Sequence, residues 1–277
     1  MIAFSLLLFS LTGSGTFAQE TLPASVETQM AAGIQALKRG DLDTAESIFS
    51  EAVRHGVKHP LIFHNLGVIA QQRGNHQQAI AEFRKAILLQ PGYGPTRLLL
   101  GTSLLAVGKN AEAVSELKRS VRLMPEQPLA HLHLAKAYEA SDNLTAAVEE
   151  FQKLAEMAPL DTEYAYQLGK AWSKLSGWSY QQMARLNPNS ARLHQALGQQ
   201  YLIREKYDLA MRAYQQAAQS DPKLPEIHLA MALISLELKK FDEALTEINL
   251  ELKLVPESKA AAEAKTKIEA AKASAAP

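Results

Sequence analysis

Residues Gly74–Gly92, GNHQQAIAEFRKAILLQPG, are the stretch of sequence that decides the fold. Ala79 and Phe83 are four residues apart, so on a helix the small and the large side chain lie on one face. Gly74 precedes them and tolerates a left-handed turn, whereas Pro91 follows and forces the residue before it out of the α region. The stretch therefore predicts a turn, a helix and a terminator, with a helix that packs closely against another helix.

The same pattern recurs along the chain with a period of 34 residues. Proline keeps this spacing at Pro91, Pro125 and Pro159, and again at Pro188, Pro222 and Pro256. The turn glycine recurs as Gly40, Gly74 and Gly108. The alanine recurs as Ala45, Ala79, Ala113, Ala147, Ala210 and Ala244, and the large residue as Phe49, Phe83, Leu117, Phe151, Tyr214 and Ile248. A fixed period over most of a chain predicts stacked repeats.

Small residues also precede the turn glycine, in pairs such as Leu66-Gly67 and Leu100-Gly101. They are expected where the two helices of a repeat cross, because backbones can approach closely only where side chains are small. Each hairpin of helices is then apolar on both sides and must be covered by its neighbours.

This pattern resembles the tetratricopeptide repeat, in which small residues occupy repeat positions 8, 20 and 27 and proline occupies position 32. The resemblance covers Val26–Ser258 and implies an all-α fold, a right-handed superhelical α-solenoid of about seven helical hairpins. We expect the repeats within residues 19–258, starting near Val26, Pro60, Gly94, Pro128, Thr162, Ala191 and Pro225. Residues 259–277 are expected to form an Ala-rich capping helix with a frayed tail from Ala273.

The fifth repeat is five residues shorter than the others between its first helix and its terminating Pro188. We expect its turn at Gly177 and a short second helix over Trp178–Leu186. Its rings Trp172, Trp178 and Tyr180 have two interpretations: they fill the hole left by the shortened helix, or they form a pocket for a ligand side chain.

Composition excludes several function classes. Lys plus Arg and Asp plus Glu both number 29, so the basic surplus typical of a nucleic-acid binder is missing. The sequence has no cysteine and therefore neither disulfides nor thiolate metal sites. It also lacks the nucleophile-elbow, phosphate-loop and zinc-protease motifs. We therefore expect no enzyme activity, no cofactor and no metal.

Two groups of polar residues are expected to have structural roles and not to form sites. His131, His194 and His228 stand at position 4 of their repeats, where packing explains them better than metal binding. The pairs Glu149-Glu150 and Lys239-Lys240 are interpreted as solvated helix faces.

The first eighteen residues, MIAFSLLLFSLTGSGTFA, differ from the rest of the chain. The apolar run Ile2–Leu11 is too short to span a bilayer, and small residues at Thr16 and Ala18 suit cleavage before Gln19. The segment predicts a signal peptide at residues 1–18 and a periplasmic or extracellular protein with no stable membrane insertion after cleavage. The alternative is a membrane anchor formed by an uncleaved N-terminus.

The resemblance also implies where a partner binds, because positions 5 and 9 of the first helices face the concave groove of the family. The peptide-binding candidates are Leu98, Thr102, Leu132, Lys136, Tyr166, Lys170, Gln195 and Gln199. We expect a non-catalytic scaffold that binds a protein or peptide segment there, in envelope assembly or secretion. The alternative is an accessory or regulatory subunit held stably by an enzyme or a transport complex.

Overall fold

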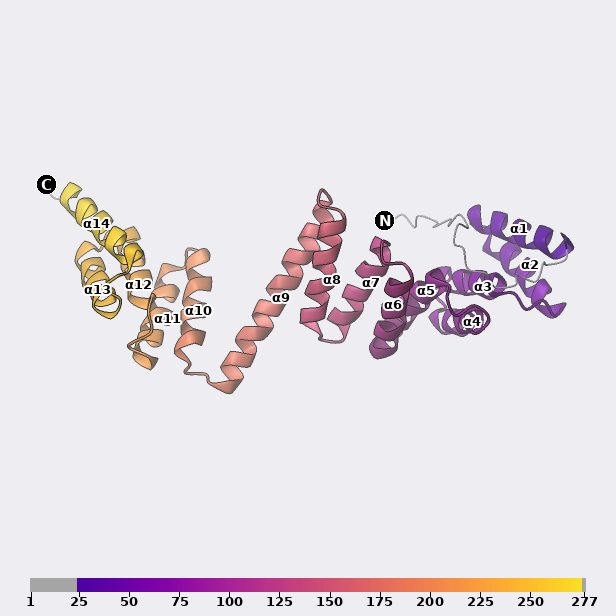
Figure 1. The fold of residues 1–277 in the computed structure, drawn as a ribbon, viewed down its shortest axis with the longest axis horizontal. Helices are drawn as coiled ribbons and strands as arrows, with labels where there is room; N and C mark the ends of the chain where they lie inside the picture. Colours follow the sequence, from indigo (N-terminus) through magenta and orange to yellow (C-terminus); the bar gives the residue numbers. More distant parts are fainter. Residues whose placement is uncertain (1–23, 276–277) are drawn as a thin grey trace. The chain divides into compact units, whose positions relative to one another are not determined.

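The computed structural model describes residues 24–275, which form fourteen α-helices and no strand (Figure 1). The all-α repeat fold predicted from the 34-residue period is confirmed. The predicted signal peptide, residues 1–18, lies outside the described residues. The chain divides into two compact units, residues 1–173 and 174–277, which are considered separately.

The first unit contains four helical hairpins. Their helices are α1 (Ala24–Lys38), α2 (Leu42–Arg54), α3 (Pro60–Gln72), α4 (His76–Leu89), α5 (Gly94–Ala106), α6 (Asn110–Leu123), α7 (Pro128–Ala140) and α8 (Leu144–Met157). Within each hairpin the two helices pack together, and the second helix packs against the first helix of the next hairpin. The helices α3, α5 and α7 also contact one another in turn, which makes the first helices a continuous layer.

The second unit contains two hairpins and a final helix. Its helices are α10 (Ala191–Ile203), α11 (Tyr207–Ser220), α12 (Ile227–Glu237), α13 (Phe241–Leu254) and α14 (Lys259–Ser274). The last helix packs on α12 and α13 through Ala261, Ala264 and Ile268, and its other residues are mostly exposed. This helix covers the apolar end of the stack, and it continues past Ala273, where the sequence led us to expect fraying.

Each hairpin is held together where its two helices cross, by contact between a small residue of the first helix and a large residue of the second. The large residue of the second helix is fully buried in five hairpins and 4% exposed in the sixth: Phe49, Phe83, Leu117, Phe151, Ile248 and Tyr214. A Cβ built on Gly67 would lie 2.5 Å from the Phe83 ring, and one on Gly101 would lie 2.4 Å from Leu117 Cγ. The two helices therefore approach so closely that only glycine fits at these positions.

The turns between paired helices need a left-handed residue. Gly40, Gly74 and Gly108 have φ values of 76°, 74° and 76°. The later hairpins place Asp142, Glu205 and Lys239 at the same point of the turn, with φ between 56° and 57°. The left-handed turn is therefore kept even where a side chain makes it unfavourable.

The fifth repeat differs from our expectation, because it is not a hairpin. A single helix, α9 (Thr162–Leu186), runs through Gly177, so the predicted turn there is wrong. Because the repeat is five residues short, a turn at Gly177 would leave only residues 178–186 for a second helix. A glycine inside a helix costs only about 1 kcal/mol relative to alanine. Continuing the helix is therefore easier than ending and restarting it.

The close approach of α3 and α4 predicts how substitutions change the stability of the protein. Replacing Gly67 by Leu drives a side chain into the Phe83 ring and should lower the free energy of unfolding by about 1 to 3 kcal/mol. The exposed Gln72 ends the same helix, so its replacement by Leu is a matched control that should change little. Urea unfolding of both variants measures the difference, and equal losses would show that the crossing is not tightly packed.

Candidate functional site

The eight predicted binding residues lie on first helices, but their side chains are not equally accessible. Lys136, Lys170 and Gln199 are exposed, and Tyr166 is 64% exposed. The remaining side chains are half-buried at Thr102, Leu132 and Gln195 and buried at Leu98. Six of the eight belong to the first unit, whereas Gln195 and Gln199 belong to the second.

The prediction that Leu98 offers its side chain to a partner is wrong. Only 5% of Leu98 is exposed, and it belongs to a core cluster that includes Phe83, Leu104 and Leu134. The reason is that α5 has first helices on both sides of it, α3 and α7. An apolar side chain on a helix that lies between two other helices is buried in the core. Its position within one repeat does not reveal this burial.

Thr102 lies in a hydrogen-bond network that joins two first helices. The amide Nε2 of Gln71 on α3 lies 2.8 Å from the Thr102 hydroxyl, 2.9 Å from the Ser103 hydroxyl and 3.3 Å from the Leu99 carbonyl oxygen. A second contact of the same kind joins His64 Nδ1 to the Thr96 hydroxyl at 2.8 Å. These contacts hold α3 against α5. The Thr102 hydroxyl therefore bonds within the protein and is not offered to a partner.

Four candidates of the first unit remain available to a ligand. On α7, the half-buried Leu132 precedes the exposed Lys136 by one helical turn, and on α9 the exposed Tyr166 precedes Lys170 in the same way. Neither ammonium group forms an ion pair within residues 24–275. Each helix thus presents one apolar or aromatic group and one uncompensated positive charge.

In the second unit, the predicted residues are glutamines on α10. Gln195 accepts a hydrogen bond from the guanidinium of Arg192 at 2.9 Å, and Gln199 is exposed. This pair is polar and uncharged, so its chemistry differs from that of the lysines.

Buried pairs of one basic and one acidic residue recur inside the repeats and have a structural role. Glu150 was predicted to be solvated, but it is 7% exposed and lies 2.6 Å from Nδ1 of His131, so that expectation is wrong. The other ring nitrogen of His131 lies 2.8 Å from the Pro125 carbonyl oxygen. The adjacent Glu149 is exposed, as predicted.

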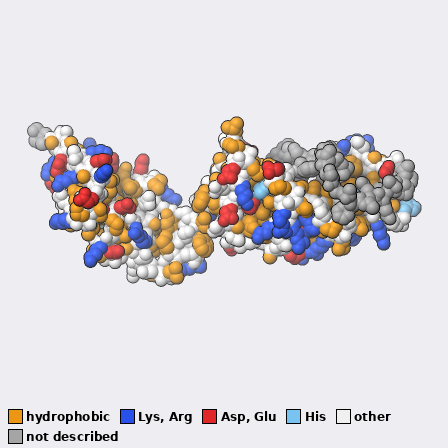
Figure 2. Space-filling view, viewed as in Figure 1, with side chains coloured by type: hydrophobic (Ala, Val, Ile, Leu, Met, Phe, Trp, Pro, Cys, Tyr) orange, Lys and Arg blue, Asp and Glu red, His pale blue; other side chains and the backbone are white. Residues whose placement is uncertain are grey.

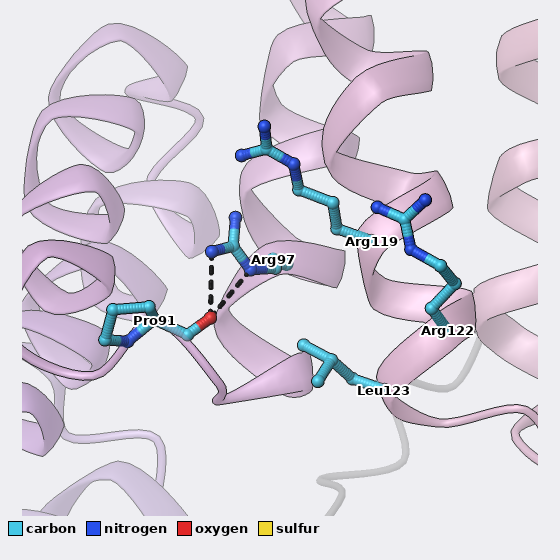
Figure 3. Close-up of a pocket in the computed structure, with 5 residues that line it drawn as sticks. All are labelled: Pro91, Arg97, Arg119, Arg122 and Leu123. Carbon is cyan, nitrogen blue, oxygen red and sulfur yellow. Dashed lines mark hydrogen bonds between the residues drawn. The ribbon is translucent and has the colours of Figure 1, made fainter.

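The preceding hairpin uses arginine for the same purpose. Arg97 donates from Nε and from Nη2 to the Pro91 carbonyl oxygen, at 2.9 and 2.8 Å (Figure 3). It also pairs with Glu116. In both hairpins a basic residue at position 4 joins its own second helix to the loop before the hairpin. Each of these basic side chains thus has both of its partners inside the protein.

A shallow basic hollow was missed by the sequence analysis. A cavity of about 240 Å³ is lined by Pro91, Arg97, Arg119, Arg122 and Leu123 (Figure 3). Figure 2 shows a group of Lys and Arg side chains over α6, where the last two arginines lie. The hollow could not be predicted from the sequence, because Arg119 and Arg122 approach Arg97 only through the packing of α6 against α5.

The aromatic residues of the shortened repeat do not fill a hole. Trp172 is 51% exposed and Trp178 is 47% exposed, so the interpretation that these rings replace a missing helix in the core is wrong. Among the residues of α9, all of which are described, only Ala171 is buried.

Among the described residues, no group of three His, Asp or Glu side chains is arranged to hold a metal ion. No helix within the same residues has the length and apolar character needed to cross a membrane.

Comparison with known families and structures agrees with the fold. Models of the tetratricopeptide repeat match residues 60–93 and 98–162, and a TPR repeat model matches residues 198–239. The chain belongs to the tetratricopeptide repeat family. Members of this family generally mediate protein–protein interactions. A search of curated proteins found no match.

Several solved repeat proteins are similar in fold. A tetratricopeptide repeat protein from Parabacteroides merdae is 16% identical, with a TM-score of 0.50, over 89% of this chain and all of its own. MamA from Desulfovibrio magneticus RS-1 is 18% identical, with a TM-score of 0.47, over 73% of this chain and 98% of its own. The Cut9–Hcn1 assembly is 21% identical, with a TM-score of 0.44, over 88% of this chain, which spans 42% of that chain's length.

Two histidines of the first helices give a prediction for pH. Burial lowers the pKa of His64 to about 4, and burial together with the Lys136 charge lowers the pKa of His133 to about 4. The unfolded chain, with histidine pKa values near 6.5, therefore binds more protons between pH 6.5 and pH 4, so stability falls as the pH drops through this range. Between pH 7 and pH 5, the melting temperature of a His64→Gln, His133→Gln variant should fall less than that of the natural protein. An equal fall in both would contradict the assignment.

Proposed function

We propose that this protein is an exported, non-catalytic scaffold that binds a protein segment on the first-helix face of its first unit. The proposed site consists of two pairs of residues, Leu132 with Lys136 on α7 and Tyr166 with Lys170 on α9, and we call the two pairs together the lysine face. The observation that carries the proposal is the pair of uncompensated ammonium groups, each one helical turn from an apolar or aromatic side chain, in a member of a protein-binding repeat family.

The chemistry of the lysine face favours an acidic or carboxylate-bearing partner. Exposed lysines add little to the stability of the protein itself, about 0 to 1 kcal/mol even when paired. They are therefore available to steer an anionic segment, while Tyr166 offers a large and rigid contact surface. The electrically neutral chain as a whole would not attract such a partner by net charge, so selectivity would rest on this local charge.

Export is proposed from the sequence alone, on the apolar run Ile2–Leu11 and the small residues before Gln19. In that setting the scaffold would serve assembly or secretion at the cell envelope.

The binding proposal is tested by reversing the two charges. A protein partner is first isolated by using the natural protein as bait. A Lys136→Glu, Lys170→Glu variant should bind this partner at least tenfold more weakly than the natural protein does, with a melting temperature that barely changes. A matched control carries the same charge change at Lys58 and Lys223, which are exposed residues outside the first helices. Isothermal titration of each variant with the partner measures the effect. Equal affinity of the Lys136→Glu, Lys170→Glu variant and the natural protein would remove the lysine face as the site.

Export is tested by sequencing the N-terminus of the natural protein. The sequence should begin near Gln19, because cleavage follows the small residue Ala18. A protein that retains Met1 in the cytosolic fraction would contradict the proposal.

A further inference from the structure

The basic hollow at α5 and α6 contains a buried arginine with spare hydrogen-bond donors. Arg97 is only 7% exposed, and it is held by the Pro91 carbonyl oxygen and by the carboxylate of Glu116. These bonds use three of the five N–H groups of its guanidinium, which leaves two without an acceptor among the described residues. Arg97 is therefore a fixed cation that can still donate hydrogen bonds to an anion in the hollow that it lines.

Two exposed arginines of α6 complete the basic hollow. Nη1 of Arg119 lies 3.3 Å from Oε1 of Glu116, whereas Arg122 forms no ion pair within residues 24–275. Three guanidinium groups therefore line the hollow (Figure 3), and Glu116 is the one described carboxylate that pairs with any of them. The hollow keeps an excess of positive charge. The planar, forked donors of guanidinium match the oxygens of a phosphate group better than a lysine ammonium does.

The repeat pattern does not account for all three arginines. The positions 34 residues before and after them hold other side chains: Phe63, Lys85 and Leu88 in the α3–α4 hairpin, and His131, Lys153 and Glu156 in the α7–α8 hairpin. In all three hairpins the middle residue pairs with the glutamate three positions before it, so Arg119 repeats a contact of the fold. Arg122 does not, because α4 has a leucine at its position and α8 a glutamate. Its charge is the one that the architecture of the hairpins leaves unexplained.

We propose that the basic hollow binds a phosphate group. Its volume of about 240 Å³ lies below the roughly 300 to 1,000 Å³ of pockets that enclose a drug-sized ligand, so it suits one small charged group. Binding would break no bond within the protein, because Arg122 and two N–H groups of Arg97 have no acceptor to give up. The site lies on α5, α6 and the loop before them, and it shares no residue with the lysine face.

Exposed leucines beside the basic hollow favour a phospholipid headgroup as the source of this phosphate. Leu123, which lines the hollow, is 44% exposed. Leu88 and Leu89 end α4, three and two residues before Pro91, and are 82% and 43% exposed. Leucines next to basic residues suit the surface of an anionic membrane, where the leucines reach the acyl chains and the arginines contact headgroup phosphates. A soluble phosphate would gain nothing from these leucines.

Co-sedimentation of the purified protein with vesicles tests the lipid source. Affinity for phosphatidylcholine vesicles that contain phosphatidylglycerol should fall at least tenfold in an Arg119→Gln, Arg122→Gln variant, with an unchanged melting temperature because both side chains are exposed. A Lys38→Gln, Arg39→Gln variant removes the same charge at the turn of the first hairpin and should bind as the natural protein does. An equal loss in this control would show that binding follows net charge and would overturn the proposal.

Isothermal titration with glycerol 3-phosphate distinguishes a soluble phosphate from a lipid. A Leu88→Ser variant should bind the anionic vesicles more weakly and glycerol 3-phosphate unchanged, because Leu88 meets only the acyl chains. If only the affinity for glycerol 3-phosphate falls in the Arg119→Gln, Arg122→Gln variant, the phosphate site stands and its ligand is soluble. If neither the vesicles nor glycerol 3-phosphate lose affinity in that variant, the basic hollow is no phosphate site and the proposal is overturned.

Discussion

The close crossing of two helices is the contact on which this structure depends. A small residue on the first helix admits a large one from the second, and five of the six large residues are completely buried. The distance between the backbones is set by this contact, since a single added Cβ at Gly67 would come within 2.5 Å of a ring. The left-handed turns, the terminating prolines and the buried basic residues at position 4 all serve to hold the two helices in this arrangement.

The helix α9 shows what happens where the contact cannot form. Its first half keeps the small residues of a crossing, and its second half keeps the large one, but the missing residues include those that would make the turn. The backbone then satisfies its hydrogen bonds by continuing as a helix, and the apolar side chains of α9 remain half-exposed instead of entering a core. The shortened repeat therefore gives a helix that has the surface of a hairpin without its internal partner.

The sequence predicted the parts of the fold that depend on local spacing. Six hairpins and their left-handed turns follow from a period of 34 residues, because small, large, turn and terminator residues act within one repeat. The turn at Gly177 was predicted wrongly because the repeat lacks five residues at this point, and the backbone keeps its hydrogen bonds by continuing as one helix. Leu98 and Glu150 were predicted exposed and are buried, because their surroundings come from neighbouring helices that the spacing within one repeat does not describe. Lys136 and Lys170 are exposed on α7 and α9, and binding at these residues stays a proposal, because spacing within one repeat carries no information about the chemistry of a partner.

The central claim is that the large residue stabilises the chain only where a second helix crosses a small residue. The direct measurement is urea unfolding, in dilute solution, of Phe83→Ala beside Tyr180→Ala. The account predicts a loss of about 3 to 5 kcal/mol for Phe83, which is fully buried at its crossing, and less than about 1 kcal/mol for Tyr180, which has no crossing partner within its own chain. Similar losses for the two variants would contradict it.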